Sequence, residues 1–460
     1  MRVRLFTAGT LPSPISHIGT KANWSFIRGL YSPPFDRGDR HLYDFRPQRY
    51  LIRNSKREPL TQRFQWSRPV NFAIPKKTIL LAALLVLTVA VGWSRPAPKN
   101  TNWYFAVSGD SRDCGDLIMP KIAQAIADNR ENAPVDFYWH LGDLRAIFRL
   151  DCDMAMTKDP SFKCPPKFLR DEDPTVRSEY LSAAWSDFIN HQIKPFETRG
   201  LPFYLGIGNH ELIPPKTHDE FRQQFKEWLT KPTLQQQRKS DRKKGIASND
   251  GDTYFHFLWK GVDIIYMDNA NIYADQDPAN QDPGFSEREL AWLDLILKRD
   301  EADSQVKTII VGMHAALPES VARDHAMDRN CASFCNGKRA YDRLRVTQSK
   351  GKKVYVLASH SHYFEEYIYD TPENGGHGLQ GWIIGTAGAE QYRPEIKYGY
   401  LLVEVTSDGT IHCSFQRVYS DSVPVGPEGL TKYCFEQNKR PAPARPEAYK
   451  TRADCACTTH

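Results

Sequence analysis

The sequence predicts an α/β fold, and three observations support this. From Trp103 onward, short apolar runs of strand length alternate with amphipathic stretches that have helical spacing. The end of this region is rich in strand-like segments. Polar residues follow directly after several of the expected strands. This alternation is typical of a sandwich in which helices cover β-sheets.

Strands are expected where β-branched and aromatic residues form short runs bounded by turn residues, and helices where apolar residues recur every three to four positions. The expected strands are 103–108, 135–140, 201–207, 253–258, 262–267, 306–312, 353–358, 363–369, 381–385, 400–405 and 411–418. The expected helices are 116–128, 180–193, 218–229 and 286–298. Two polar stretches that contain cysteines, 149–173 and 323–338, are interpreted as insertions.

Five of the expected strands end in residues that can bind a metal. The blocks are Gly109-Asp110-Ser111-Arg112, Gly142-Asp143, Gly208-Asn209-His210-Glu211, His314 and Ser359-His360-Ser361-His362. In α/β folds such strand ends gather at one site. Each block alone has an ordinary explanation, such as a turn, a helix cap or a buried histidine. Their ordered recurrence instead predicts a centre of carboxylate, amide and imidazole ligands for divalent transition metals.

In this order, the blocks resemble the calcineurin-like metallophosphoesterase superfamily over about residues 103–365. The resemblance implies a four-layer sandwich of two mixed β-sheets flanked by helices, and a dinuclear centre of manganese, iron or zinc. It implies that His210 lies near the leaving group, as general acid or transition-state stabiliser. The implied metal ligands are Asp110 and His362 for the first ion, Asp143 as the bridge, and Asn209, His314 and His360 for the second ion.

The first block departs from the family pattern, which is Asp-x-His. Arg112 stands in place of the histidine, and Ala146 stands where purple-acid-phosphatase-like relatives have a tyrosine. Further ligands for the first ion would then come from Asp113, Asp116 or water. Arg112 is expected to contact the substrate phosphate, because guanidinium matches phosphate oxygens, and the alternative is a structural salt bridge.

These features predict a phosphoric ester hydrolase in which a metal-bound hydroxide attacks phosphorus in line. His210, held by a nearby acidic residue, is expected to assist the leaving oxygen. One alternative is a membrane-anchored pseudoenzyme or binding module that has lost one metal to Arg112, and another is a structural envelope protein. A serine hydrolase is disfavoured because no GxSxG occurs. Small phosphomonoesters, phosphodiesters and nucleotides all remain open as substrates.

The charge of the chain is unevenly distributed. Residues 1–77 contain 15 Lys and Arg and 4 Asp and Glu, which gives this segment a net charge of +11. Because the whole chain has a net charge of +6, the remainder carries −5. A nucleic-acid scaffold role is therefore not expected. The uncharged apolar run 78–93 follows Lys76 and Lys77, which favours a transmembrane or signal segment with the body on the extracytoplasmic side, in the periplasm or cell envelope. The expected organisation is a basic arm (1–77, or a misassigned start), this segment (78–93), a linker (94–100), the catalytic domain (101–420) and a C-terminal extension (421–460).

Nine cysteines are present, and none forms a CxxC pair. Disulfides in an oxidising compartment are therefore favoured over thiolate metal sites. An odd number leaves at least one cysteine unpaired within the chain. Oligomeric state is left open.

Overall fold

The computed structural model describes residues 102–438 except Pro166, 273–283, 323–324, 329, 393–397 and 420–427, and it also describes Cys455 and Cys457. The predicted arm, apolar segment and linker lie outside these residues. Among the residues that are described, no helix is long and apolar enough to span a membrane.

The elements follow one another in the alternating order that the sequence predicts. The strands are β1 (Trp103–Ser108), β2 (Val135–His140), β3 (Phe203–Leu205), β4 (Phe255–Trp259), β5 (Val262–Met267), β6 (Thr308–Met313), β7 (Lys353–Ala358), β8 (Phe364–Glu366), β9 (Gln380–Ile384), β10 (Tyr398–Val405) and β11 (Ile411–Tyr419). The α-helices are α2 (Gly115–Asp128), α3 (Cys152–Lys158), α4 (Pro174–Phe188), α5 (Lys194–Glu197), α6 (His218–Gln224), α7 (Lys226–Leu229), α8 (Pro232–Lys243), α9 (Glu287–Ala302), α10 (Cys331–Ser349) and α11 (Glu428–Asn438). Shorter turns are η1 (Leu169–Asp171), η2 (Ile189–Ile193), η3 (Asn209–Leu212) and η5 (Pro372–Asn374).

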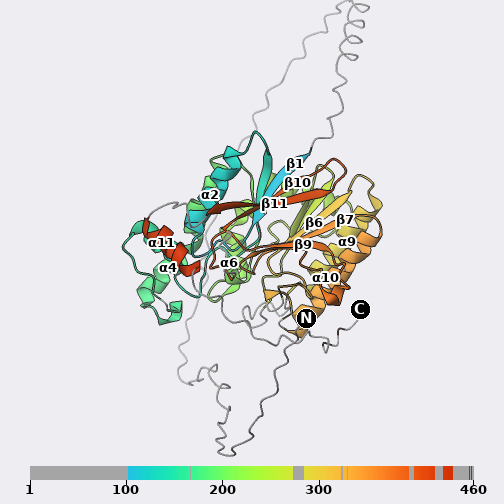
Figure 1. Cartoon of the computed structure of the whole chain (residues 1–460). Helices are drawn as coiled ribbons and strands as arrows, with labels where there is room; N and C mark the ends of the chain where they lie inside the picture. The colour runs from blue at the N-terminus through green and yellow to red at the C-terminus, as the bar shows by residue number, and fades with distance from the viewer. Residues whose placement is uncertain are drawn as a thin grey trace, which may run out of the picture. The chain divides into compact units, whose positions relative to one another are not determined.

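Two mixed sheets form the centre of the described region, as predicted. One has the strand order β11-β10-β1-β2-β3, with β1, β2 and β3 parallel and β10 and β11 antiparallel. The other has the order β4-β5-β6-β7-β9-β8, with parallel β5, β6, β7 and β9 between antiparallel edge strands. Helix α2 lies beside β10 and β11, while α9 and α10 lie beside the second sheet (Figure 1). Helices therefore flank both sheets.

Side chains of β5 alternate between two cores. Ile264 and Tyr266 belong to the core that the two sheets share, whereas Ile265 and Met267 pack with the apolar face of α9. Successive side chains of a strand point to opposite faces, so a strand buried on both faces is apolar throughout. The two sheets approach closely where Trp139 of β2 packs on Gly312 of β6. No side chain would fit there, since a Cβ on that glycine would lie 2.3 Å from the indole.

The structure corrects several predicted elements. The helix expected over 180–193 is α4 followed by the single π-helical turn η2, and the helix expected over 218–229 is divided into α6 and α7 at Phe225. The stretch 323–338 is not wholly an insertion, because α10 begins at Cys331. Helix α8 was not predicted, since its sequence is almost entirely polar.

Disulfides pair eight cysteines, and Cys413 is free. The pairs are Cys114–Cys434, Cys152–Cys164, Cys331–Cys455 and Cys335–Cys457. Three of these bonds tie residues after 421 to the body of the fold.

Candidate metal centre

The predicted ligands converge at the carboxyl ends of strands from both sheets. Asp110 follows β1, Asp143 follows β2, and Asn209 opens η3 after β3. His314 follows β6, and His360 follows β7. All of these side chains are buried. The two sheets thus contribute to one site at a shared edge, as the order of the motifs predicts.

The backbone is strained at three of the predicted ligands. Asp110, Asp143 and His360 have φ angles of 59°, 60° and 62°, in the left-handed region that non-glycine residues rarely adopt. Such conformations persist where the surrounding structure fixes them, and they cluster at functional sites. Gly208 has an ordinary extended backbone and is required for space, since a Cβ there would lie 2.3 Å from Asp143 Oδ1.

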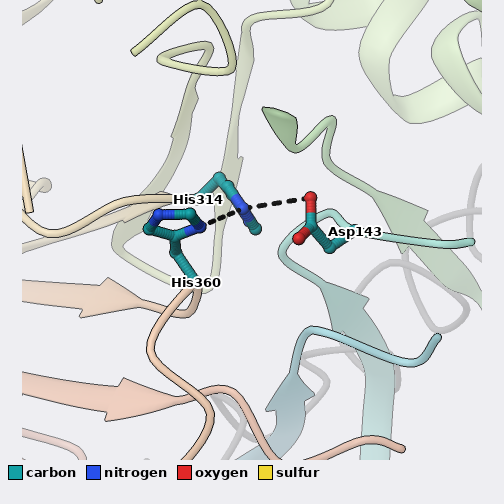
Figure 2. Close-up of side chains that lie close together, drawn as sticks. All are labelled: Asp143, His314 and His360. Atoms are coloured by element: carbon teal, nitrogen blue, oxygen red, sulfur yellow. Dashed lines mark hydrogen bonds and ion pairs between the residues drawn. The ribbon is translucent and has the colours of Figure 1, made fainter. Parts of the chain in front are cut away.

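Four potential ligand atoms meet around His314, and we call this group cluster B. His314 Nε2 lies 3.1 Å from Asp143 Oδ1, 3.0 Å from Asn209 Oδ1 and 3.1 Å from His360 Nδ1. Figure 2 shows the two imidazoles and the carboxylate pointing toward one another. Carboxylate, amide and imidazole donors within this distance fit a divalent transition metal.

The protein fixes which nitrogen of His314 faces cluster B. Nδ1 lies 3.1 Å from the carbonyl oxygen of Leu141, which can only accept, so Nδ1 carries the proton and Nε2 is directed inward. Burial lowers the pKa of His314, but the Asp143 carboxylate outweighs this and raises it to about 9. A cation, either a proton or a metal ion, is therefore favoured among these acceptors.

A second group, cluster A, consists of Asp110, Asp143 and His362, whose ligand atoms lie within 4.8 Å of one another. His362 Nε2 is 3.3 Å from Asp110 Oδ1. Asp110 Oδ1 and Asp143 Oδ2 are buried and accept no hydrogen bond from the described part of the chain. Asp143 belongs to both groups.

Arg112 extends into cluster A. Its Nη2 lies 3.0 Å from His362 Nε2, and its Nε lies 4.0 Å from Asp143 Oδ2. Burial disfavours its charge, but the carboxylates of Asp113 and Asp143 raise its pKa, so the guanidinium stays protonated. The residues of cluster A therefore do not fit a metal ion while Arg112 holds this position.

His210 lies at the centre, but its neighbour differs from the prediction. Nδ1 is 2.6 Å from the carbonyl oxygen of Ala146, so a backbone group orients the ring and not an acidic residue. The adjacent Glu211 instead accepts hydrogen bonds from the backbone N–H groups of Gly208, Asp143 and Leu144. Nε2 of His210 lies 3.5 Å from Asp143 Oδ2. Burial lowers the pKa of His210 to about 4.

Asp113 and Asp116 are not additional ligands, contrary to the sequence-based expectation. Both carboxylate oxygens of Asp113 accept hydrogen bonds from Arg149 Nη2, at 3.0 and 2.9 Å. Asp116 pairs with the buried guanidinium of Arg145 at 2.6 Å. Asp113 is therefore paired with Arg149, while Asp116 shares the guanidinium of Arg145 with Asp153 and Asp187.

Two aromatic residues at the centre were missed by sequence reasoning. Tyr392 stacks on His362, with ring centroids 4.3 Å apart, and Phe148 lies against His210 at 5.3 Å. Tyr392 is 30 residues from His362 in the sequence, and Phe148 directly precedes the stretch 149–173 that was interpreted as an insertion, so no local spacing indicated either residue.

Comparisons with known proteins agree with this geometry. A sequence model of calcineurin-like phosphoesterases matches residues 114–364, more than half of the chain. The match begins after the block that contains Asp110 and Arg112. No curated protein is significantly similar in sequence.

Solved structures with a similar fold include a dimetal phosphatase from Danio rerio and GAP50, the anchor in the inner membrane complex of Plasmodium. The first is 14% identical with a TM-score of 0.42, covering 70% of this chain and 98% of the other. The second is 14% identical with a TM-score of 0.41, covering 70% and 87%. Neither similarity is close enough to carry over a function.

Proposed function

This chain belongs to the calcineurin-like phosphoesterase family, and on that premise we propose that it hydrolyses small phosphate esters with the help of a divalent transition metal. The observation that carries the proposal is cluster B, where Asp143, Asn209, His314 and His360 direct ligand atoms toward one point. These four residues would hold the ion.

When bound, the ion would activate water and neutralise charge on the phosphoryl oxygens. Arg112 adds a permanent positive charge beside Asp143. Charge that develops on the phosphoryl oxygens in the transition state would be stabilised by this buried guanidinium, because fixed charges act strongly where water is excluded. The strained backbone at Asp143 and His360 supports a preorganised arrangement.

We propose that His210 assists the leaving oxygen. Its Nδ1 proton is donated to the Ala146 carbonyl, so only Nε2 can donate toward the centre, and only when the ring is protonated. In the neutral ring, Nε2 is an acceptor. His210 can therefore act as general acid only in its protonated form, which the lowered pKa of about 4 restricts to acidic pH, with the transferred proton held at Nε2.

Substitution of two cluster B ligands tests the proposal. We expect Asp143→Asn and His360→Gln each to reduce hydrolysis of aryl phosphate monoesters or diesters by at least about 100-fold, because charge stabilisation in the transition state is lost. Asp136→Asn is the matched control, since Asp136 lies at the other end of β2 and pairs with Lys260. Full metal-dependent activity in both ligand variants would refute the assignment.

The alternative is a pseudoenzyme or binding module, and the position of Arg112 in cluster A favours it specifically. A chain that binds a divalent ion at cluster B yet hydrolyses neither monoester nor diester would support this alternative. The hydrolase and the pseudoenzyme are therefore distinguished by turnover, because both are expected to bind a metal ion at cluster B.

We also propose that the catalytic part works in an oxidising, extracytoplasmic compartment. The four disulfides support this, because such bonds persist mainly outside reducing compartments. Attachment to a membrane through residues 78–93 remains a prediction from the sequence. Fractionation of cells that express the full chain, with and without residues 78–93, tests both points.

A further inference from the structure

We infer that the Arg112 guanidinium takes the place of a metal ion in cluster A, so that the centre holds one divalent ion and one fixed organic cation. The inference rests on the proposed metal-dependent function of the same site. The inference concerns which groups supply the positive charge at the site. It predicts one metal ion, whereas the family resemblance implies two.

The first step is the state of His362. Its Nδ1 lies 2.7 Å from the carbonyl oxygen of Glu390, which can only accept, so Nδ1 carries the proton. The lone pair of Nε2 is then the only one available for a metal. Arg112 Nη2, a hydrogen-bond donor without acceptor capacity, lies 3.0 Å from that nitrogen. The nitrogen of His362 that could bind a metal therefore already accepts a hydrogen bond from Arg112.

The second step is the placement of Arg112. Its side chain is 7% exposed, and its guanidinium carbon lies 5.8 Å from the centre of the Phe148 ring. The partners for its positive charge are the neighbouring Asp113, which also binds Arg149, and the carboxylates of cluster A. An arginine does not lose its proton in a protein, so it cannot become neutral to admit a second cation.

The third step is the contrast between the two clusters. At cluster B, the neighbours of His314 Nε2 are Asp143, Asn209 and His360, and a cation among these atoms relieves their mutual repulsion. At cluster A, a guanidinium already faces the corresponding nitrogen. Carboxylate and imidazole groups are thus arranged around a metal position in cluster B and around an arginine in cluster A.

The manganese content of the full chain tests the inference. The chain is freed of metal with chelator, loaded with Mn²⁺, separated from excess ion and analysed for manganese per chain, with thermal melting as the check on folding. We expect about one ion in the wild type, about one in His362→Gln and none in His360→Gln. The two histidine variants are matched in residue type, burial and motif, and only the cluster differs.

Arg112→His restores the Asp-x-His pattern and removes the guanidinium. We expect this variant to bind a second Mn²⁺ and to show the electron paramagnetic resonance signal of two coupled ions. A folded Arg112→His that gains no ion would show that Arg112 is not what excludes metal from cluster A, and this would overturn the inference.

A wild-type chain that binds two ions, or a His362→Gln chain that loses one, would also overturn the inference. These counts do not depend on turnover. Two ions with active hydrolysis would leave the proposed function in place, while one ion without hydrolysis would reject the proposed function and keep the inference.

Discussion

At His210, a single backbone carbonyl determines which ring nitrogen faces the proposed metal centre. Because Ala146 accepts the Nδ1 proton, Nε2 is the atom directed toward Asp143. We predict that His210→Gln lowers kcat by about 100-fold or more at acidic pH, where the ring with its pKa of about 4 is protonated, and that the loss shrinks as pH rises. The loss should be larger for an alkyl phosphate than for a nitrophenyl phosphate, since a poor leaving group needs the proton more.

Steady-state kinetics with both substrates measure this difference. The control is His412→Gln, because His412 is exposed on β11. An equal loss for the two leaving groups would assign His210 to substrate binding and contradict its role as acid.

Ser359 directly precedes His360, and its hydroxyl contacts His314, a proposed metal ligand. Oγ lies 3.1 Å from His314 Nδ1 and 3.1 Å from the Leu141 carbonyl. Partners of ligating histidines typically contribute about 10- to 100-fold to metal affinity. We predict that Ser359→Ala weakens Mn²⁺ binding by about 10-fold in calorimetric titration.

Ser361 provides the matched control for this measurement. It is equally buried, two residues further on, and its hydroxyl has no hydrogen-bond partner among the described residues. Ser361→Ala should leave the Mn²⁺ affinity unchanged. Similar losses in both variants would mean that packing, not orientation of His314, sets the affinity.

The sequence predicted which residues converge on the site better than it predicted their hydrogen-bond and ion-pair partners. Asp143, His314 and His360 were identifiable because each lies shortly after the end of a strand, and strand ends converge in this fold class. Asp113 and Asp116 were wrongly offered as ligands, because the arginines that neutralise them lie about 30 or more residues away. Such pairings arise from the tertiary fold and leave no local spacing.

Helix α8, strands β4 and β5 and helix α9 meet at a buried charged network. His256 Nδ1 lies 2.8 Å from Asp263 Oδ1, and His256 Nε2 lies 2.9 Å from Asp241 Oδ2. Arg299 lies on the same network, 2.6 Å from Asp263. Burial lowers the pKa of His256, but Asp263 and Asp241 outweigh this and raise it to about 9.

A raised pKa in the folded state means that folding favours the protonated ring. The stabilisation is fully present below the unfolded value of about 6.5 and is lost as pH rises through about 9. We predict that the free energy of unfolding falls by about 3 kcal/mol more between about pH 6 and about pH 10 in the wild type than in His256→Gln. Urea denaturation at the two pH values measures this.

The exposed His377 supplies the control, since His377→Gln should keep the wild-type pH dependence. If His256→Gln retained the full fall in stability, the network would not be the source of the pH dependence.

At the level of elements, the apolar strands were predicted closely and the polar helices were not. β5 and β7 have the predicted bounds, because strands buried on both faces are marked by continuous apolar residues. α8 has no apolar stripe, and its few buried residues include Arg238 and Asp241. Its position is set by side-chain pairing with β4 and α9, which local periodicity does not encode.

For the whole described unit, the Cys114–Cys434 bond joins α11 to the beginning of α2. Cys114 is the N-cap of α2, close after the block that holds Asp110 and Arg112, and the bonded residues are 320 positions apart. Long closed loops favour a large effect on stability, typically about 2 to 5 kcal/mol. We predict that Cys114→Ser combined with Cys434→Ser lowers the free energy of unfolding by about 4 kcal/mol.

Denaturant titration of the double variant measures this loss, and Cys413→Ser is the control because Cys413 is free. An unchanged stability in the double variant would mean that α11 contributes nothing to holding the start of α2.

The central claim is that cluster B makes this chain a metal-dependent phosphoester hydrolase. The most direct measurement is hydrolysis of an aryl phosphate monoester and diester by the full chain before chelation, after chelation, and after restoring manganese, iron or zinc. We predict turnover that disappears with chelator and returns with at least one of these ions. Turnover that persists after the metal has been removed, or no turnover with any of the three ions bound, would contradict the claim.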